Sequence, residues 1–92
     1  MTLKIETSSD GETATLRLIG RIESEYLKEL RTQVRRHRAP VVLDLVEVTL
    51  VDVGVVRFLI ACEGEGVELL HCSPYIREWM ARERDTRRGD SI

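Results

Sequence analysis

The spacing of hydrophobic residues changes along the chain and separates strand-like from helix-like segments. Residues 3–7 and 13–19 are short strand-like runs. Asp10 and Gly11 lie between them and suit a tight turn, because both residue types tolerate a positive φ angle. The pattern therefore predicts an N-terminal β-hairpin whose second strand ends at Gly20.

A first helix is predicted for residues 24–37, with Ser24 as its N-cap and Pro40 enforcing its end. Glutamates lie early in this segment and arginines lie late, an order that complements the helix dipole. Its apolar residues recur at helical spacing, so one stripe is expected to face the core. That stripe consists of Leu27, Leu30 and Val34.

Strand and helix alternate through the middle of the chain. Residues 41–45 are nearly all apolar, as a strand covered on both faces requires. A second helix is predicted from just past Asp52 to about Glu63. Residues 67–72 are then predicted to form a further strand.

A third helix is predicted after Ser73 and Pro74, which supply a capping hydroxyl and a first-turn proline in the right order. The charged residues 84–92 are expected to fray. The order β-β-α-β-α-β-α implies right-handed crossovers between parallel strands. We therefore predict an α/β fold, one small domain over residues 1–92 with its core in residues 3–83. Its four-stranded sheet is mostly parallel, with an antiparallel edge hairpin.

Length and charge narrow the classes of function. A chain of 92 residues supports one domain, and a net charge of −2 argues against general binding to polyanions. No apolar run approaches the roughly 20 residues that span a bilayer, and the N-terminus lacks the pattern of a signal peptide. We therefore expect a cytoplasmic protein without direct membrane insertion.

One basic run raises nucleic-acid binding as an alternative. Residues 31–38 contain four arginines and one histidine, a local patch of the kind that contacts phosphates. No aromatic residue interleaves with them, and the helix dipole already explains cations at a helix C-terminus. A solvated face is the favoured interpretation, so no nucleic-acid partner is expected.

The residues give little support to catalysis or metal binding. The candidate nucleophiles are Cys62 and Cys72, which look like buried reduced thiols, and Ser24 and Ser73, which are better explained as helix caps. The chain contains no phosphate-binding glycine motif and no CxxC or HxxxH spacing. We therefore expect no enzyme activity, no cofactor and no metal.

A single charge stands where the third apolar strand gives way to the second helix. As N-cap, Asp52 would accept hydrogen bonds from backbone N–H groups of the first turn. At about 100° per residue, one apolar side of this helix should face the sheet. The opposite strip consists of Gly54, Arg57 and Ala61, with Val53 and Phe58 at its margins. Periodicity does not decide whether this strip docks a partner or is merely solvated.

The segment VVLDLVEVTLVDVGVVRFL, residues 41–59, resembles the central signature of STAS domains, the anti-sigma-factor antagonist and sulphate-transporter C-terminal family. Residues 20–23 are similar to the segment that precedes the first helix in that family, and residues 66–69 are similar to its last strand. The resemblance covers residues 3–83. The positions in register are Asp44-Leu45, Val48-Thr49 and Asp52.

The chain departs from the family pattern at the start of the second helix. In regulatory STAS domains, a partner kinase phosphorylates the serine directly after the aspartate. Here Val53 stands at that serine, Gly54 at the second serine and Val55 at the family's glycine. Because valine has no hydroxyl, phosphorylation at this position is chemically excluded.

The resemblance implies a non-catalytic bacterial interaction module that docks a regulatory protein, such as an anti-sigma factor or serine kinase, in signalling and transcription regulation. The alternatives are a STAS subunit of a membrane transporter complex for a lipid or anion, and a small-ligand or nucleotide sensor. Homodimerisation is left open. Carried over residue by residue, the partner-binding residues are Thr49, Asp52, Val53, Gly54, Arg57 and Ala61.

Overall fold

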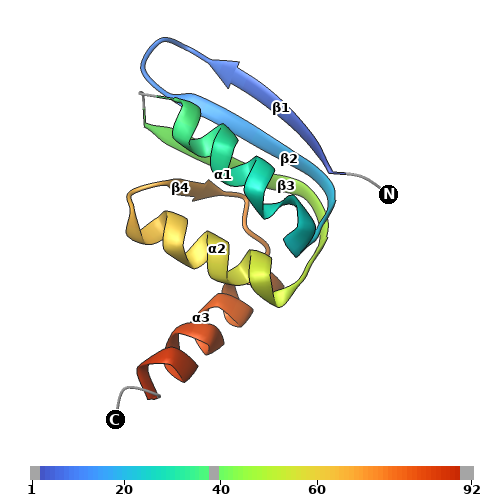
Figure 1. Cartoon of the computed structure of the whole chain (residues 1–92), viewed down its shortest axis with the longest axis vertical. Coiled ribbons are helices and arrows are strands. Elements are labelled where there is room, and N and C mark those ends of the chain that lie inside the picture. Colours follow the sequence, from blue (N-terminus) through green and yellow to red (C-terminus); the bar gives the residue numbers. More distant parts are fainter. Residues whose placement is uncertain (1–2, 38–39, 90–92) are drawn as a thin grey trace.

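The computed structural model describes residues 3–37 and 40–89, with side chains described as far as residue 85. Its strands form one mixed sheet in the order β1-β2-β3-β4, and the helices α1 and α2 lie over one face of that sheet (Figure 1). The predicted element order and the single α/β domain are confirmed. The elements are β1 (Lys4–Ser9), β2 (Ala14–Ile22), a 3-10 turn η1 (Ser24–Tyr26), α1 (Leu27–Arg36), β3 (Val41–Val51), α2 (Val53–Gly64), β4 (Glu68–Leu70) and α3 (Pro74–Gly89).

The hairpin and the strand directions follow the prediction. β1 pairs with β2 antiparallel, whereas β2–β3 and β3–β4 are parallel. Between β1 and β2, Asp10 Oδ1 accepts hydrogen bonds from the backbone N–H groups of Glu12 at 2.9 Å and Thr13 at 2.8 Å. Gly11 follows Asp10 with a φ of 91°, a conformation that glycine adopts without steric cost.

The core lies between the sheet and the helices. α3 packs against α2 and is preceded by Ser73, whose Oγ accepts a hydrogen bond from Ile76 N at 3.3 Å, so the predicted cap is confirmed. The largest fully buried side chains come from the sheet and all three helices. They are Leu16, Leu18, Ile22, Leu30, Leu43, Val55, Val56, Leu59 and Met80.

Two predicted strand boundaries are wrong. β2 does not end at Gly20 but continues to Ile22; Gly20 takes a φ of 97°, and the register of β2 with β3 shifts next to it. The neighbouring strand β3 runs through Val51, up to Asp52, where the sequence predicted the change from strand to helix. β4 is shorter than predicted and ends at Leu70, because His71 turns into the left-handed region with a φ of 56°.

Two helix ends also differ from the prediction. Ser24 is not an N-cap: it starts η1, α1 follows at Leu27, and neither start has a side-chain cap hydrogen bond. At the other end of the chain, α3 continues to Gly89, where fraying was expected from residue 84. Residues 84–89 include three arginines, which are good helix formers, and Arg84 pairs with Glu63 of α2.

Candidate functional site

Asp52 joins three elements at the point where β3 leads into α2. Its carboxylate accepts a hydrogen bond from Val55 N at 3.0 Å, so the predicted N-cap is confirmed. It also accepts bonds from Ser24 N and Ser24 Oγ, each at 2.8 Å. Partial burial acts to raise the pKa of Asp52, but the hydrogen bonds from Ser24 and Val55 outweigh it and hold that pKa below 3.8. The carboxylate therefore fixes η1 against the first turn of α2.

Gly54 is small because of packing inside the chain. A Cβ atom at this position would lie 2.2 Å from Ser24 Oγ and 3.2 Å from Ser24 Cβ. Ser24 cannot rotate its hydroxyl away without losing the bond to Asp52. The structure therefore gives Gly54 an internal reason, where the sequence pattern placed it on an exposed strip.

We expect Gly54→Ala to lower the free energy of unfolding by about 1–3 kcal/mol, the usual cost of overpacking. Urea titration of the variant measures this. Gly64→Ala is the matched control, since no atom lies within 4 Å of a Cβ there and alanine improves helix propensity. Adding Ser24→Gly to Gly54→Ala removes both atoms that the new Cβ would approach. The double variant should therefore lose less free energy of unfolding than the sum of the two single variants. A loss equal to that sum would contradict the packing explanation.

Two apolar side chains beside Asp52 face solvent. Leu50 is 46% exposed and Val53 is 40% exposed, and Thr49 next to them is exposed as well. The sequence interpretation did not single out Leu50 as an exposed residue of β3. The β2–β3 register pairs Gly20 with Val48 but Arg21 with Leu50, so Thr49 is an extra residue in β3. Leu50 lies opposite the exposed Arg21 of β2, and its neighbour Val51 lies opposite the buried Ile22.

The remaining predicted site residues lie further along α2. Arg57 is held by α3, with its Nε 3.0 Å from Glu83 Oε1, while its side chain stays 59% exposed. Phe58 is buried and not marginal as predicted, because it packs toward α1. Ala61 is exposed but lies two turns beyond Val53, so the structure does not bring it to the strand–helix junction.

A second polar cluster, centred on Asp44, sits on β3 beside the β4–α3 connection. Asp44 Oδ1 lies 3.0 Å from His71 Nδ1 and accepts a bond from Val46 N at 3.1 Å, while Oδ2 lies 3.6 Å from Arg17 Nε. Burial acts to raise the pKa of Asp44, but these neighbours, His71 first, hold it below 3.8. The cluster ties the corner after β4 to the centre of the sheet.

Both cysteines are free thiols: Cys62 is buried, and Cys72 is partly buried against the core. Burial raises the pKa of Cys62 to about 11 and also raises the pKa of Cys72. Neither forms a disulfide. Within residues 3–37 and 40–85, no group of three or more histidine, cysteine, aspartate or glutamate side chains is arranged to hold a metal ion.

Comparison with protein families decides what kind of domain this is. A family model described as "Mlab, STAS domain" matches residues 5–82, which include β2, β3, β4, all but the first residue of β1, and the β3–α2 junction. The chain belongs to the STAS domain family. Among curated proteins, no relative matches it. In this STAS domain, no described helix is long and apolar enough to cross a membrane.

Two solved structures share the fold of this STAS domain. "Structure of the Anti-Sigma Factor Antagonist SpoIIAA in its Unphosphorylated Form" matches with a TM-score of 0.65 at 18% identity, covering 99% of this chain and 100% of that one. "Crystal Structure Analysis of Mglu" matches with a TM-score of 0.51 at 23% identity, covering 75% of this chain and 19% of that one. At these identities the similarity establishes the fold alone.

Proposed function

We propose that this STAS domain is a non-catalytic cytoplasmic module that binds a regulatory protein through its junction face. The junction face is defined here by Thr49, Leu50, Asp52, Val53 and Arg57. It comprises the last exposed residues of β3 and the first turns of α2. Family membership and the fold similarity to an anti-sigma-factor antagonist support a protein partner.

The exposure of Leu50 and Val53 on either side of Asp52 is the observation that carries the proposal. Full burial of such a side chain stabilises by about 1.5–3 kcal/mol, and these two are nearly half exposed. A partner that covered both would therefore gain about 1 kcal/mol from each. The surrounding backbone is fixed by the Asp52 hydrogen bonds, so binding would cost little ordering.

Partner binding at this face must be regulated by something other than phosphorylation of a serine after Asp52. The similar solved structure is named for its unphosphorylated form, which is a statement about that protein. Here Val53 begins α2 and offers no hydroxyl to a kinase. We therefore infer a docking face whose occupancy follows the abundance of its partner or a ligand.

The partner is best identified by affinity capture from the source cells followed by mass spectrometry. An anti-sigma factor or related serine kinase, captured through the junction face, supports the proposal in full. A transporter ATPase subunit captured through the same face would assign the module to a membrane transporter complex. Recovery of proteins at equal levels by the wild type and by a Leu50→Asp variant would contradict docking at the junction face.

Arg57→Glu tests the charged edge of the junction face. The substitution reverses an exposed charge, so the affinity for the captured partner should fall by about fivefold, as for one surface ion pair. It also places two carboxylates together, because Glu83 is the present partner of Arg57. The charge-swap variant Arg57→Glu/Glu83→Arg restores that pair and is the matched control. Calorimetry should show weakened binding for both variants, and unchanged affinity would remove Arg57 from the face.

A further inference from the structure

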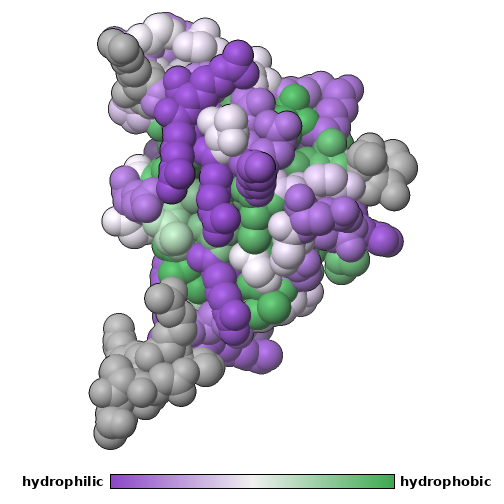
Figure 2. All heavy atoms as spheres, viewed as in Figure 1, coloured by the Kyte–Doolittle hydropathy of each residue, from purple (hydrophilic) through white to green (hydrophobic). Residues whose placement is uncertain are grey.

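A small groove between α1 and α2 lies apart from the junction face. Its cavity volume is about 60 Å³. Figure 2 shows hydrophobic surface between strongly hydrophilic side chains on the face formed by these helices. The residues that line the groove are Arg31, Val34, Arg35, Phe58, Ala61, Cys62 and Glu65.

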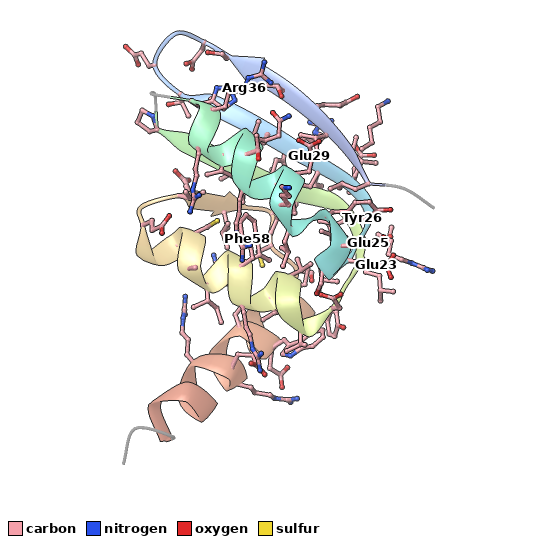
Figure 3. All side chains as sticks on the ribbon, viewed as in Figure 1. Glu23, Glu25, Tyr26, Glu29, Arg36 and Phe58 are labelled. Atoms are coloured by element: carbon pink, nitrogen blue, oxygen red, sulfur yellow. The ribbon has the colours of Figure 1, made fainter. Side chains whose placement is uncertain are left out.

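The floor of the groove is apolar and uncharged. Phe58 and Cys62 are buried, and Figure 3 shows Phe58 between α1 and α2. The Cys62 thiol stays protonated near neutral pH because burial raises its pKa to about 11. Ala61 is exposed and has only a methyl group, which leaves the groove open. A cavity of about 60 Å³ leaves room for one short aliphatic side chain.

The rim of the groove carries unpaired positive charge. Arg31 and Arg35 are exposed, and neither makes a salt bridge within the described part of the chain. The charges of this segment are separated along the chain, with Glu23 and Glu25 at the η1 end and Arg36 at the far end of α1 (Figure 3). Glu65 is the one acidic side chain on the rim. Unpaired cations around an apolar cavity complement an acidic segment with an apolar anchor.

We propose that this groove binds an acidic segment of a protein partner. One aliphatic side chain of that segment fills the cavity, and neighbouring carboxylates pair with Arg31 and Arg35. This surface is additional to the junction face, and it gives Ala61 a role that the junction does not. A nucleic acid fits less well, because the chain has a net charge of −2 and the only aromatic ring in the groove is buried.

The probe is a fluorescein-labelled 16-residue peptide of glutamate and alanine with leucines at i, i+4 spacing. Control peptides replace every leucine with alanine or every glutamate with lysine. Fluorescence anisotropy should show that the wild-type domain binds the first peptide more tightly than either control. Arg31→Glu/Arg35→Glu should weaken binding by about 25-fold, as two surface ion pairs of about fivefold each predict. Ala61→Leu, which fills the cavity, should weaken it at unchanged charge.

Matched variants separate this proposal from the junction face. Leu50→Asp should leave peptide binding unchanged, and Arg31→Lys/Arg35→Lys should largely preserve it. Failure of the acidic peptide to bind, or equal binding by the leucine-free control, would overturn the proposal. Tighter binding of a 16-nucleotide DNA strand that depends on Arg31 and Arg35 would instead assign the surface to nucleic acid and overturn it as well. None of these outcomes bears on whether Leu50 and Val53 dock a partner.

Discussion

Asp52→Ala is expected to lower the free energy of unfolding by about 2–3 kcal/mol, a large share of the stability of a domain this small. The substitution removes the N-cap of α2 and leaves Ser24 without the acceptor for both its backbone N–H and its hydroxyl. A helix cap alone accounts for about 1 kcal/mol, and hydrogen bonds to a charged group contribute more than neutral ones. Urea unfolding followed by circular dichroism measures the loss.

Two comparisons show whether the Asp52 hydrogen bonds cause that loss. Asp52→Asn keeps an oxygen acceptor for one or two of the bonds, so it should cost less than alanine. The pKa of Asp52 is held below 3.8 in the folded state. Its contribution is therefore fully present above pH 3.8 and is lost as the pH falls through the folded pKa. The gap between wild type and Asp52→Ala should shrink under those acidic conditions, and a gap that stays constant would exclude the carboxylate as its source.

Leu50→Asp/Val53→Asp is expected to abolish detectable partner binding while the domain stays folded. Both side chains are nearly half exposed in the free protein, so replacing them removes little of the core. In a complex, each aspartate would be desolvated against the partner without a matching charge, which costs far more than losing an apolar contact. Losses of 2 kcal/mol or more at such anchors correspond to about 30-fold in affinity each.

The control for this prediction is Val46→Asp. Val46 is 53% exposed, more than Leu50, and lies on β3 outside the junction face. Val46→Asp introduces the same charge as Leu50→Asp, on the same strand. Binding by Val46→Asp should match the wild type, and melting curves of all variants should stay close together. A similar loss from Val46→Asp would point to a general charge effect and away from a defined face.

Local patterns were sufficient to predict the fold and the cap. The change from strand to helix spacing gave the element order, because each element buries one apolar face. Asp52 and Ser73 were identified as caps because a polar side chain just before an apolar helix has few other uses. These features depend on neighbours within a few residues, which is the range over which sequence patterns carry information.

The details missed at the site depend on contacts between distant segments. Ser24 has the pattern of an N-cap, yet its hydroxyl bonds Asp52, 28 residues away, and that contact also explains why Gly54 must be small. Leu50 lies opposite the exposed Arg21 because of the register in which β2 and β3 pair, which the pattern of one strand does not reveal. The pairing of Asp44 with His71 likewise requires the parallel pairing of β3 with β4.

The most direct test of docking at the junction face is calorimetric titration of the purified captured partner into three proteins. These are the wild type, Leu50→Asp/Val53→Asp and Val46→Asp. The account predicts one-to-one binding of equal affinity for the wild type and Val46→Asp, and a loss of at least about 30-fold for the junction variant. Equal affinity for all three proteins would contradict the account and place the binding surface elsewhere on the domain.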